Sequence, residues 1–188
     1  MHIRAQINHA RRHACLSAAT LRVQGYVQIG RGAYSRAFVH PDAPDVVIKI
    51  GRHYSARVGY YDGFPYFAQQ LIDKEISSKF FPKVYALEWN SARTNFWCVM
   101  RRYKKSPRSE RTKTSATITA TFNKISGTTT HSEGKPSARY RKAVEQLVDY
   151  RLVHDIHAGN VMRDYRSDTP IIIDPLLIKK HHRQDFYA

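Results

Sequence analysis

Apolar runs in the first hundred residues predict a sheet with one helix. The expected strands are 26–29, 36–39, 46–50, 81–87 and 96–100. The first two flank a glycine-rich turn, and the third is apolar except for a lysine, Lys49, at its centre. A helix is expected over 66–77, between the third and fourth strands. Residues 23–103 therefore predict one lobe built mainly of strands.

The second half of the chain has a different pattern. Residues 104–137 are rich in Ser, Thr and Lys and predict a long mobile insert, with one short strand at 116–122 as an option. Tyr140, Val144, Leu147 and Val148 give 138–152 a helical spacing. An isoleucine run at 171–173 predicts a buried strand that ends at Asp174. With a basic helix or arm over 1–22, the expected segments are 1–22, 23–103, 104–137 and 138–188.

Composition fits one small domain or two small lobes. The chain has 188 residues, 42% of them hydrophobic, which is enough for a packed core. Cys15 and Cys98 are far apart and follow no metal-ligand spacing, which favours a reducing compartment. The ten histidines show no metal spacing either. No apolar run has transmembrane length and no secretory signal is evident, so we expect no membrane partner.

The charge is large and uneven. The formal net charge is +16, and the stretch 101–142 carries twelve Lys or Arg residues against Glu110 and Glu133. Such a field speeds association with acidic surfaces and weakens with salt. Acidic proteins and nucleic acid are both candidate partners, although the aromatic and basic interleaving of an RNA platform is not evident. A solvated surface with no partner also fits this composition.

The chemistry concentrates near the C-terminal end. Residues 154–160 read HDIHAGN, so Asp155 and Asn160 lie five residues apart, and Asp174 follows the isoleucine run. This is the spacing of a phosphoryl-transfer loop, in which one Asp positions a hydroxyl while an Asn and a later Asp hold Mg²⁺. Carboxylate and amide oxygens are the hard ligands that Mg²⁺ prefers.

A glycine-rich turn and a strand lysine belong to the same chemistry. Gly30 and Gly32 are expected to let the backbone adopt positive φ and approach a phosphate. Lys49 follows Gly30 by 19 residues, which suits a strand that returns beneath the turn. A lysine inside an apolar strand is costly unless it is paired, and an ATP phosphate would pair it.

In this order, the motifs resemble the early serine/threonine protein kinase of short-tailed, autographivirus-type coliphages, within the protein-kinase-like superfamily. The resemblance covers roughly residues 25–178 and rests on the glycine turn, the Lys49 strand, the segment 81–85, the 155–162 loop and 173–175. It implies an α+β, minimal two-lobed protein-kinase-like fold, with an antiparallel-sheet N-lobe and a truncated helical C-lobe.

The resemblance also implies a function. It implies ATP- and Mg²⁺-dependent phosphorylation of host proteins on Ser or Thr by a bacteriophage enzyme, in the cytoplasm of the infected bacterium. The implied partners are host proteins with acidic surfaces, such as RNA polymerase or RNA-processing enzymes, and nucleic acid could contact the basic surface. Two alternatives stay open: a kinase-like binding module that inhibits an acidic or nucleic-acid-associated host complex, and a small-molecule phosphotransferase.

Residue roles follow from the same resemblance. Asp155 would position and deprotonate the substrate hydroxyl, and His157 would touch either the γ-phosphate or Asp155, or act only as a structural hydrogen-bonder. Asn160 and Asp174 would hold Mg²⁺. The expected ATP-binding residues are Gly30, Gly32, Ser35, Lys49, Met100, Arg101 and Tyr103. His154 is expected to be structural.

The chain departs from the family pattern at three points. Ser35 replaces the third glycine of the turn, and Pro175-Leu176 follows the metal-binding Asp where Phe-Gly is usual. A helical Glu that would pair with Lys49 is not evident. The candidate carboxylates are Asp73, Glu75 and Asp62, with a weak preference for Asp73.

Overall fold

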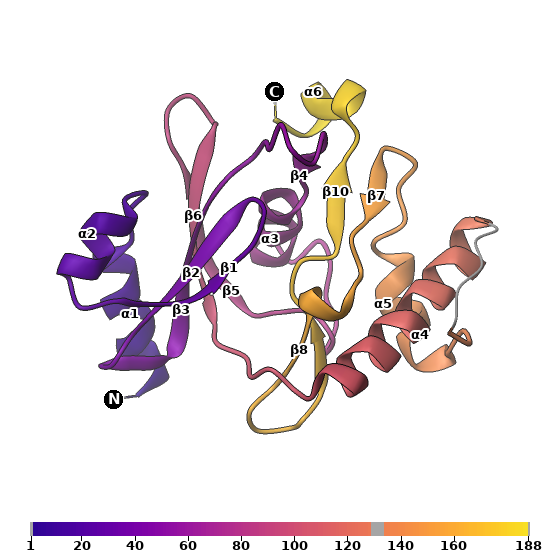
Figure 1. Ribbon diagram of the computed structural model, residues 1–188, viewed down its shortest axis with the longest axis horizontal. Helices are drawn as coiled ribbons and strands as arrows, with labels where there is room; N and C mark the ends of the chain where they lie inside the picture. The colour runs from indigo at the N-terminus through magenta and orange to yellow at the C-terminus, as the bar shows by residue number, and fades with distance from the viewer. Residues whose placement is uncertain (1, 129–133, 188) are drawn as a thin grey trace.

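The molecule has a sheet-rich part and a smaller helix-containing part, which lie side by side in Figure 1. The computed structural model describes residues 2–128 and 134–187. Its helices are α1 (Ile3–His13), α2 (Ala18–Val23), α3 (Phe64–Ile72), α4 (Arg108–Ser126), α5 (Arg141–Glu145) and α6 (Arg183–Tyr187). Its strands are β1 (Val27–Arg31), β2 (Ser35–His40), β3 (Ala43–Arg52), β4 (Tyr61–Asp62), β5 (Val84–Trp89), β6 (Asn95–Arg101), β7 (Leu152–His154), β8 (Val161–Arg163), β9 (Pro170–Ile172) and β10 (Leu176–Ile178).

The main sheet has five strands in the order β1-β2-β3-β6-β5, and every neighbouring pair is antiparallel. Its two faces serve different cores because side chains alternate along a strand. On β3, Val46, Ile48 and Ile50 pack in the cluster that includes Ala10 and Leu21 of the N-terminal helices. Val47 belongs to the other cluster, which the sheet shares with α3, α4 and the C-terminal strands. The continuous apolar run of β3 is therefore explained by burial on both faces.

The N-terminal helices cover the outer face of the sheet. Gln6 of α1 exchanges two hydrogen bonds with Asp45: its side-chain amide donates to the Asp45 carboxylate at 3.0 Å, and its Oε1 accepts from the Asp45 N–H at 2.9 Å. Ala10 of α1 and Leu21 of α2 are fully buried where the two helices meet the sheet. The basic stretch 1–22 thus contains helix, and its apolar residues dock on the sheet.

A helix replaces the mobile insert expected over 104–137. Residues 108–126 form α4, so the option of a strand at 116–122 is wrong. Ser and Thr are weak helix formers, which is why local composition suggested a loop. Packing overrides that propensity, because Ile118 is fully buried and Phe122 lies in the same core. The helix ends at Gly127, whose left-handed backbone is a common C-cap. Residues 129–133 of the expected insert lie outside the described residues.

The part after α4 is short, and its strands form two small sheets. One is a three-stranded sheet in the order β4-β10-β7, in which β4 comes from before α4 in the chain. The other is a separate hairpin of β8 and β9. The helix expected over 138–152 is only a 3-10 turn followed by the five residues of α5. The helix expected over 66–77 begins earlier and ends at Ile72.

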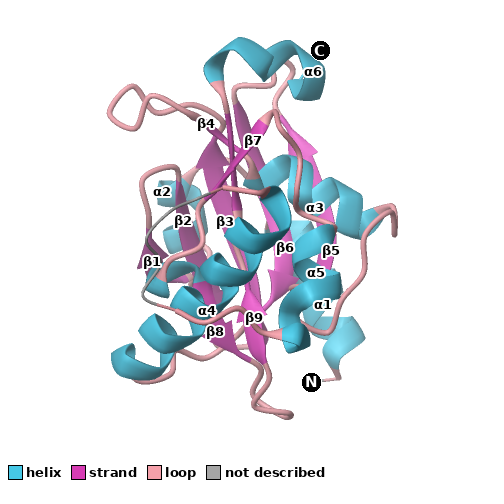
Figure 2. Cartoon of the chain, turned by 90° about the vertical axis from the view of Figure 1, so that its right-hand side faces the viewer, coloured by secondary structure: helices cyan, strands magenta, loops and turns pink. Residues whose placement is uncertain are grey.

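The sheet strands are close to their predicted ranges, and the β9 strand precedes Asp174 as the isoleucine run predicted. The predicted α+β class is confirmed: an antiparallel-sheet N-lobe is followed by a small C-lobe that contains helices. Figure 2 shows the sheet strands with helices packed around them. Among the described residues, no helix is both long enough and apolar enough to cross a membrane.

Candidate active site

A cavity of about 210 Å³ lies between the β1–β2 hairpin and the C-lobe. Its lining comes from sequence-distant segments, which the fold brings together. The lining residues are Ile29, Gly30, Arg31, Gly32, Ser35, Ala37, Val47, Lys49, Met100, Arg101, Arg102, Tyr103, Lys105, Gly159, Asn160, Met162, Ile173 and Asp174. All seven expected ATP-binding residues are in this set, as are both expected metal ligands.

Lys49 meets Asp174 at the inner end of this cavity. The Lys49 Nζ lies 2.7 Å from Asp174 Oδ2, and the two side chains are 10% and 23% exposed. The ammonium also lies 3.3 Å from the ring centroid of Phe64, a cation–π contact. The pairing expected for a lysine in an apolar strand is therefore made with a carboxylate from the other lobe.

Asp62 is the second carboxylate near Lys49. It is fully buried at the end of β4, and its Oδ1 accepts a hydrogen bond from the Phe64 N–H at 3.0 Å. Burial raises the pKa of Asp62 to about 8; the negative charge of Asp174 adds to the rise and the charge of Lys49 opposes it. Burial thus favours the protonated, neutral form of Asp62, and Asp174 is the carboxylate that pairs with Lys49.

Asp73, the weakly preferred partner of Lys49, is placed elsewhere. It is the C-cap of α3, and both its carboxylate oxygens accept hydrogen bonds from the Gln69 side chain on the protein surface. The preference for Asp73 is therefore wrong. Helix α3 presents Phe64 to the Lys49 ammonium, whose ion-pair partner is Asp174. Asp62, another of the three candidates, lies in the strand that precedes the helix.

The 154–160 loop places Asp155 and Asn160 together. The Asn160 Nδ2 donates to the Asp155 carbonyl at 2.8 Å and to its Oδ2 at 3.2 Å. Backbone hydrogen bonds hold the loop against the Asp174 segment: the Asp155 N–H donates to Pro175, and the Ile173 N–H donates to Asn160. Burial raises the pKa of Asp155; His157 opposes the rise and the charge of Asp174 adds to it. A raised pKa makes a carboxylate a stronger base.

His157 points one ring nitrogen toward Asp155. Its Nδ1 accepts from the Gly159 N–H at 3.0 Å, and its Nε2 lies 3.8 Å from Asp155 Oδ1, beyond hydrogen-bond range. Gly159 is required for this geometry, because a Cβ there would lie 2.5 Å from the His157 ring. His154, in contrast, packs against Phe122 with ring centroids 4.8 Å apart, and burial lowers its pKa. The placement of His154 agrees with the structural role expected for it, and His157 lies between its two expected neighbours, the loop backbone and Asp155.

Helix α4 supports the loop from behind. The Thr119 hydroxyl donates to the Ile156 carbonyl at 3.1 Å, and the Arg111 guanidinium donates to the Ala158 carbonyl at 2.6 Å. These contacts fix backbone atoms on both sides of His157. Sequence reasoning missed this role of α4, because nothing in a Ser- and Thr-rich segment identifies which hydroxyl will meet a distant carbonyl.

The glycine turn is an ordinary hairpin in its backbone angles. Gly30 and Gly32 are both absent from the residues with positive φ, so the expected left-handed conformation is wrong for both. The Gly32 N–H donates to the Ser35 carbonyl at 2.8 Å across the turn. What these glycines contribute is open space, since a Cβ at Gly30 or Gly32 would meet no atom closer than 3.6 Å.

The connector between the lobes, residues 101–103, also lines this cavity. The N–H groups of Arg101 and Arg102 already donate to the carbonyls of Lys83 and Asp45. A hydrogen bond from adenine to this connector would therefore use backbone groups of the connector other than these two N–H groups. Apolar lining residues that we did not select from the sequence are Ile29, Ala37, Val47, Met162 and Ile173. Val47 was identifiable, because it lies two residues before Lys49 and hence on the same face of the strand.

The oxygen donors fit Mg²⁺ in chemical type. Asp174 offers a carboxylate, and Asn160 uses its Nδ2 toward Asp155, which leaves Oδ1 for a cation. Magnesium in nucleotide sites usually takes one or two protein oxygens, with water and phosphate completing its coordination. Within 2–128 and 134–187, no group of three or more His, Cys, Asp or Glu side chains is placed to hold a metal ion.

The likenesses to solved structures include a distant one to a kinase-containing enzyme. No family model matches the chain, and no curated protein matches it. Among solved structures, it is similar to the bifunctional kinase–methyltransferase WbdD, with 16% sequence identity and a TM-score of 0.37. The match covers 75% of this chain and 29% of the WbdD chain, so the chain spans under a third of that structure. At this TM-score the likeness carries no argument about function.

Proposed function

We propose that this protein transfers the γ-phosphoryl group of ATP to Ser or Thr hydroxyls of other proteins. The observation that carries the proposal is that Lys49, Asn160 and Asp174 line one cavity beneath a glycine-rich hairpin, with the Asp155 carboxylate hydrogen-bonded to Asn160 beside it. Lys49 comes from the N-lobe sheet and the other three from residues 155–174. Together they would supply a phosphate-binding cation, a base and two oxygen ligands. The bacterial host, its cytoplasm and its RNA polymerase or RNA-processing enzymes as substrates rest on the sequence resemblance alone.

In the proposed reaction, Asp155 is the base. Its carboxylate accepts the proton of a substrate hydroxyl, whose oxygen attacks the γ-phosphorus as the bond to the β–γ bridging oxygen breaks and ADP leaves. Burial raises the pKa of Asp155, which strengthens it as an acceptor. The Asn160 hydrogen bond to Oδ2 fixes the orientation of the carboxylate.

Lys49 and Asp174 exchange partners when the nucleotide binds. In the structure they pair with one another at 2.7 Å. With nucleotide present, Lys49 would pair with its α- and β-phosphate oxygens, and Asp174 and Asn160 would hold the cation. Magnesium supplies neutralisation of the charge on the β- and γ-phosphate oxygens.

The experiment that tests this function uses ATP labelled at the γ-phosphate, Mg²⁺ and an extract of bacterial cells. We expect labelled proteins in which the phosphate is on Ser or Thr after acid hydrolysis. Label confined to small molecules would replace the proposal with the small-molecule phosphotransferase.

The binding-module hypothesis has one specific observation in its favour. Lys49 and Asp174 already satisfy one another, so the cavity is electrostatically stable without ATP. If the protein binds an acidic host complex but neither binds ATP nor transfers phosphate, the kinase proposal fails and this hypothesis takes its place.

A further inference from the structure

A second cavity lies on the face of the sheet opposite the nucleotide cavity. Arg31 faces Arg36 across β1 and β2, and Arg36 faces Ile50 on β3. Arg52 is two residues beyond Ile50 and faces Asn95 on β6. Directly paired residues share a face of a sheet, as do alternate residues of one strand. All three arginines therefore lie on the outer face, which α1 and α2 cover further along the sheet.

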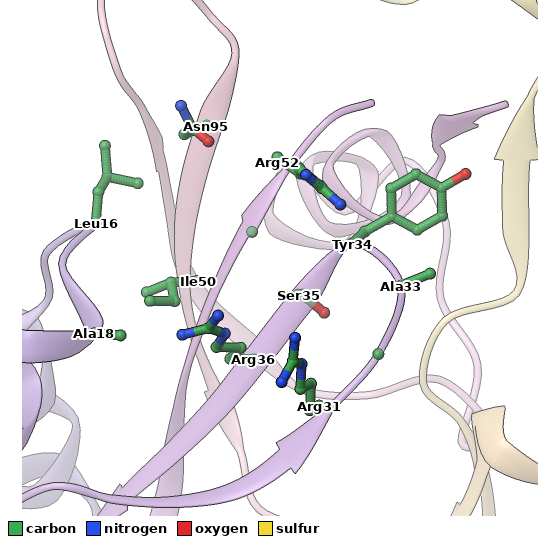
Figure 3. Close-up of a pocket in the computed structure, with 12 residues that line it drawn as sticks. Leu16, Ala18, Arg31, Ala33, Tyr34, Ser35, Arg36, Ile50, Arg52 and Asn95 are labelled. Carbon is green, nitrogen blue, oxygen red and sulfur yellow. The ribbon is translucent and has the colours of Figure 1, made fainter. Parts of the chain in front are cut away.

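The arginines surround a cavity of about 480 Å³, a size typical of ligand sites. Figure 3 shows their guanidinium groups around the hairpin, with Leu16 and Ala18 forming the wall on the side of the N-terminal helices. The other lining residues are Gly32, Ala33, Tyr34, Ser35, Ile50, Gly51 and Asn95.

None of these arginines has a carboxylate partner among the ion pairs of the described residues. Other arginines of the chain are paired, including Arg101, Arg151 and Arg163. Three like charges around one hollow repel one another, so binding an anion there relieves repulsion as well as making new bonds. The guanidinium fork matches the oxygens of carboxylates and phosphates.

An occupant of this cavity would leave the nucleotide cavity open. Ala37 faces Lys49 on the inner side of the sheet, whereas Arg36 faces Ile50 on the outer side. Only the hairpin residues Arg31, Gly32 and Ser35 line both cavities. The outer cavity can thus hold part of a partner while ATP occupies the cleft.

We infer that this arginine cavity docks an acidic segment of a protein partner, through carboxylate or phosphoserine oxygens. Nucleic acid fits less well, because single strands bind by stacking bases on exposed aromatic rings. Tyr34 is the one aromatic residue among those lining the cavity, and its hydroxyl donates to the Tyr60 carbonyl at 2.9 Å. Figure 3 shows its ring directed away from Arg31 and Arg36. That this partner is a substrate rests on the proposed function; the binding itself does not.

The test compares the double variant R36Q/R52Q with the control R57Q/R166Q. Both remove two positive charges, but Arg57 and Arg166 are exposed and lie outside the cavity. Arg31 is left unchanged because it also lines the nucleotide cavity. Binding is measured by fluorescence anisotropy, without ATP, for four labelled probes: an alternating Glu-Ala peptide, the same peptide with phosphoserine in place of Glu, its Lys-Ala counterpart, and oligouridine.

We expect one or both acidic peptides to bind the wild type, and R36Q/R52Q to weaken that binding at least about tenfold more than R57Q/R166Q does. The Glu-Ala and phosphoserine arms identify which oxyanion is preferred. If both variants weaken peptide binding equally, the loss reflects the lower net charge and not the cavity, which would overturn the inference. Oligouridine binding that R36Q/R52Q abolishes, with no peptide binding, would also overturn it in favour of nucleic acid. The binding measurement does not involve phosphoryl transfer, so the result of this test is independent of the proposed function.

Discussion

At the residue scale, three acidic side chains and one lysine determine what the cavity can do. Lys49 pairs with Asp174, Asp62 is buried with a pKa near 8, and Asp155 sits at the loop with a raised pKa. Sequence spacing was enough to select Lys49, Asp155 and Asp174. It was not enough to choose Asp62 over Asp73, because the choice depends on how β4 meets β10, a contact between residues far apart in the chain.

Replacing Lys49 with Met tests the ion pair directly. Lys49→Met leaves the partly buried Asp174 without its cation, so we expect loss of ATP-dependent transfer together with a stability loss of about 1–3 kcal/mol. Urea denaturation measures the stability. The double variant K49M/D174N should recover most of it while remaining inactive. If K49M is as stable as the wild type, the ion pair contributes nothing to the fold.

Replacing Asp62 with Asn tests its protonation. The unfolded state loses this proton near the ordinary value of 3.8, whereas the folded state keeps it up to about 8. Between these values the folded state binds more protons, so the contribution of Asp62 to stability decreases as pH rises through this window. Asp62→Asn keeps the acceptor for the Phe64 N–H and removes the titration.

The difference in Tm between D62N and the wild type should therefore grow in favour of D62N from pH 5 to pH 8, since the window runs from 3.8 to about 8. The control D73N, at an exposed Asp whose carboxylate accepts hydrogen bonds from the Gln69 amide, should show no such trend. A difference that stays constant with pH would show that Asp62 is ionised in the folded protein.

At the element scale, α4 shows where local pattern and tertiary structure disagree. The strands and the hairpin were predictable, because apolar runs and glycine turns are local signals. The helix was not, because its Ser and Thr residues favour a loop, and only burial of Ile118 and Phe122 under the C-lobe stabilises it. Its contacts to the Asp155 loop could not be read from the sequence for the same reason.

Thr119 provides a test of that support. Thr119→Val keeps the shape and removes the hydroxyl that donates to the Ile156 carbonyl. We expect a stability loss of about 1 kcal/mol and a larger effect on kcat than on KM for ATP, because the proposed function places the base, but little of the nucleotide site, on this loop. Thr117→Val is the matched control, because its hydroxyl bonds only within α4. Equal kinetics for the two variants would show that the Thr119 contact does not support the catalytic loop.

At the scale of the whole molecule, charge is the dominant property. A net charge of +16 on 188 residues produces self-repulsion, and three arginines that form no ion pair within the described part of the chain line the outer cavity. The sequence showed the excess charge, from which we predicted acidic partners. It did not reveal that Arg31, Arg36 and Arg52 share one face, because that requires the register of three strands.

Salt should therefore stabilise the free protein. Raising KCl from low to physiological ionic strength screens the repulsion between positive charges, so we expect Tm to rise. Exposed ion pairs such as Arg141–Glu145 would weaken in the same titration, which works in the opposite direction but is a small effect. A Tm that falls with added KCl would mean that attractive pairs outweigh the excess charge. Calorimetry at fixed pH makes the measurement.

The central claim is that Asp155 is the base of a phosphoryl-transfer site, and one measurement tests it most directly. Transfer from γ-labelled ATP to protein is compared for the wild type, Asp155→Asn and the exposed control Asp42→Asn, with folding of each verified by circular dichroism. We predict that D155N loses at least about 10²-fold in rate while D42N keeps the wild-type rate. Transfer by folded D155N at the wild-type rate would contradict the account.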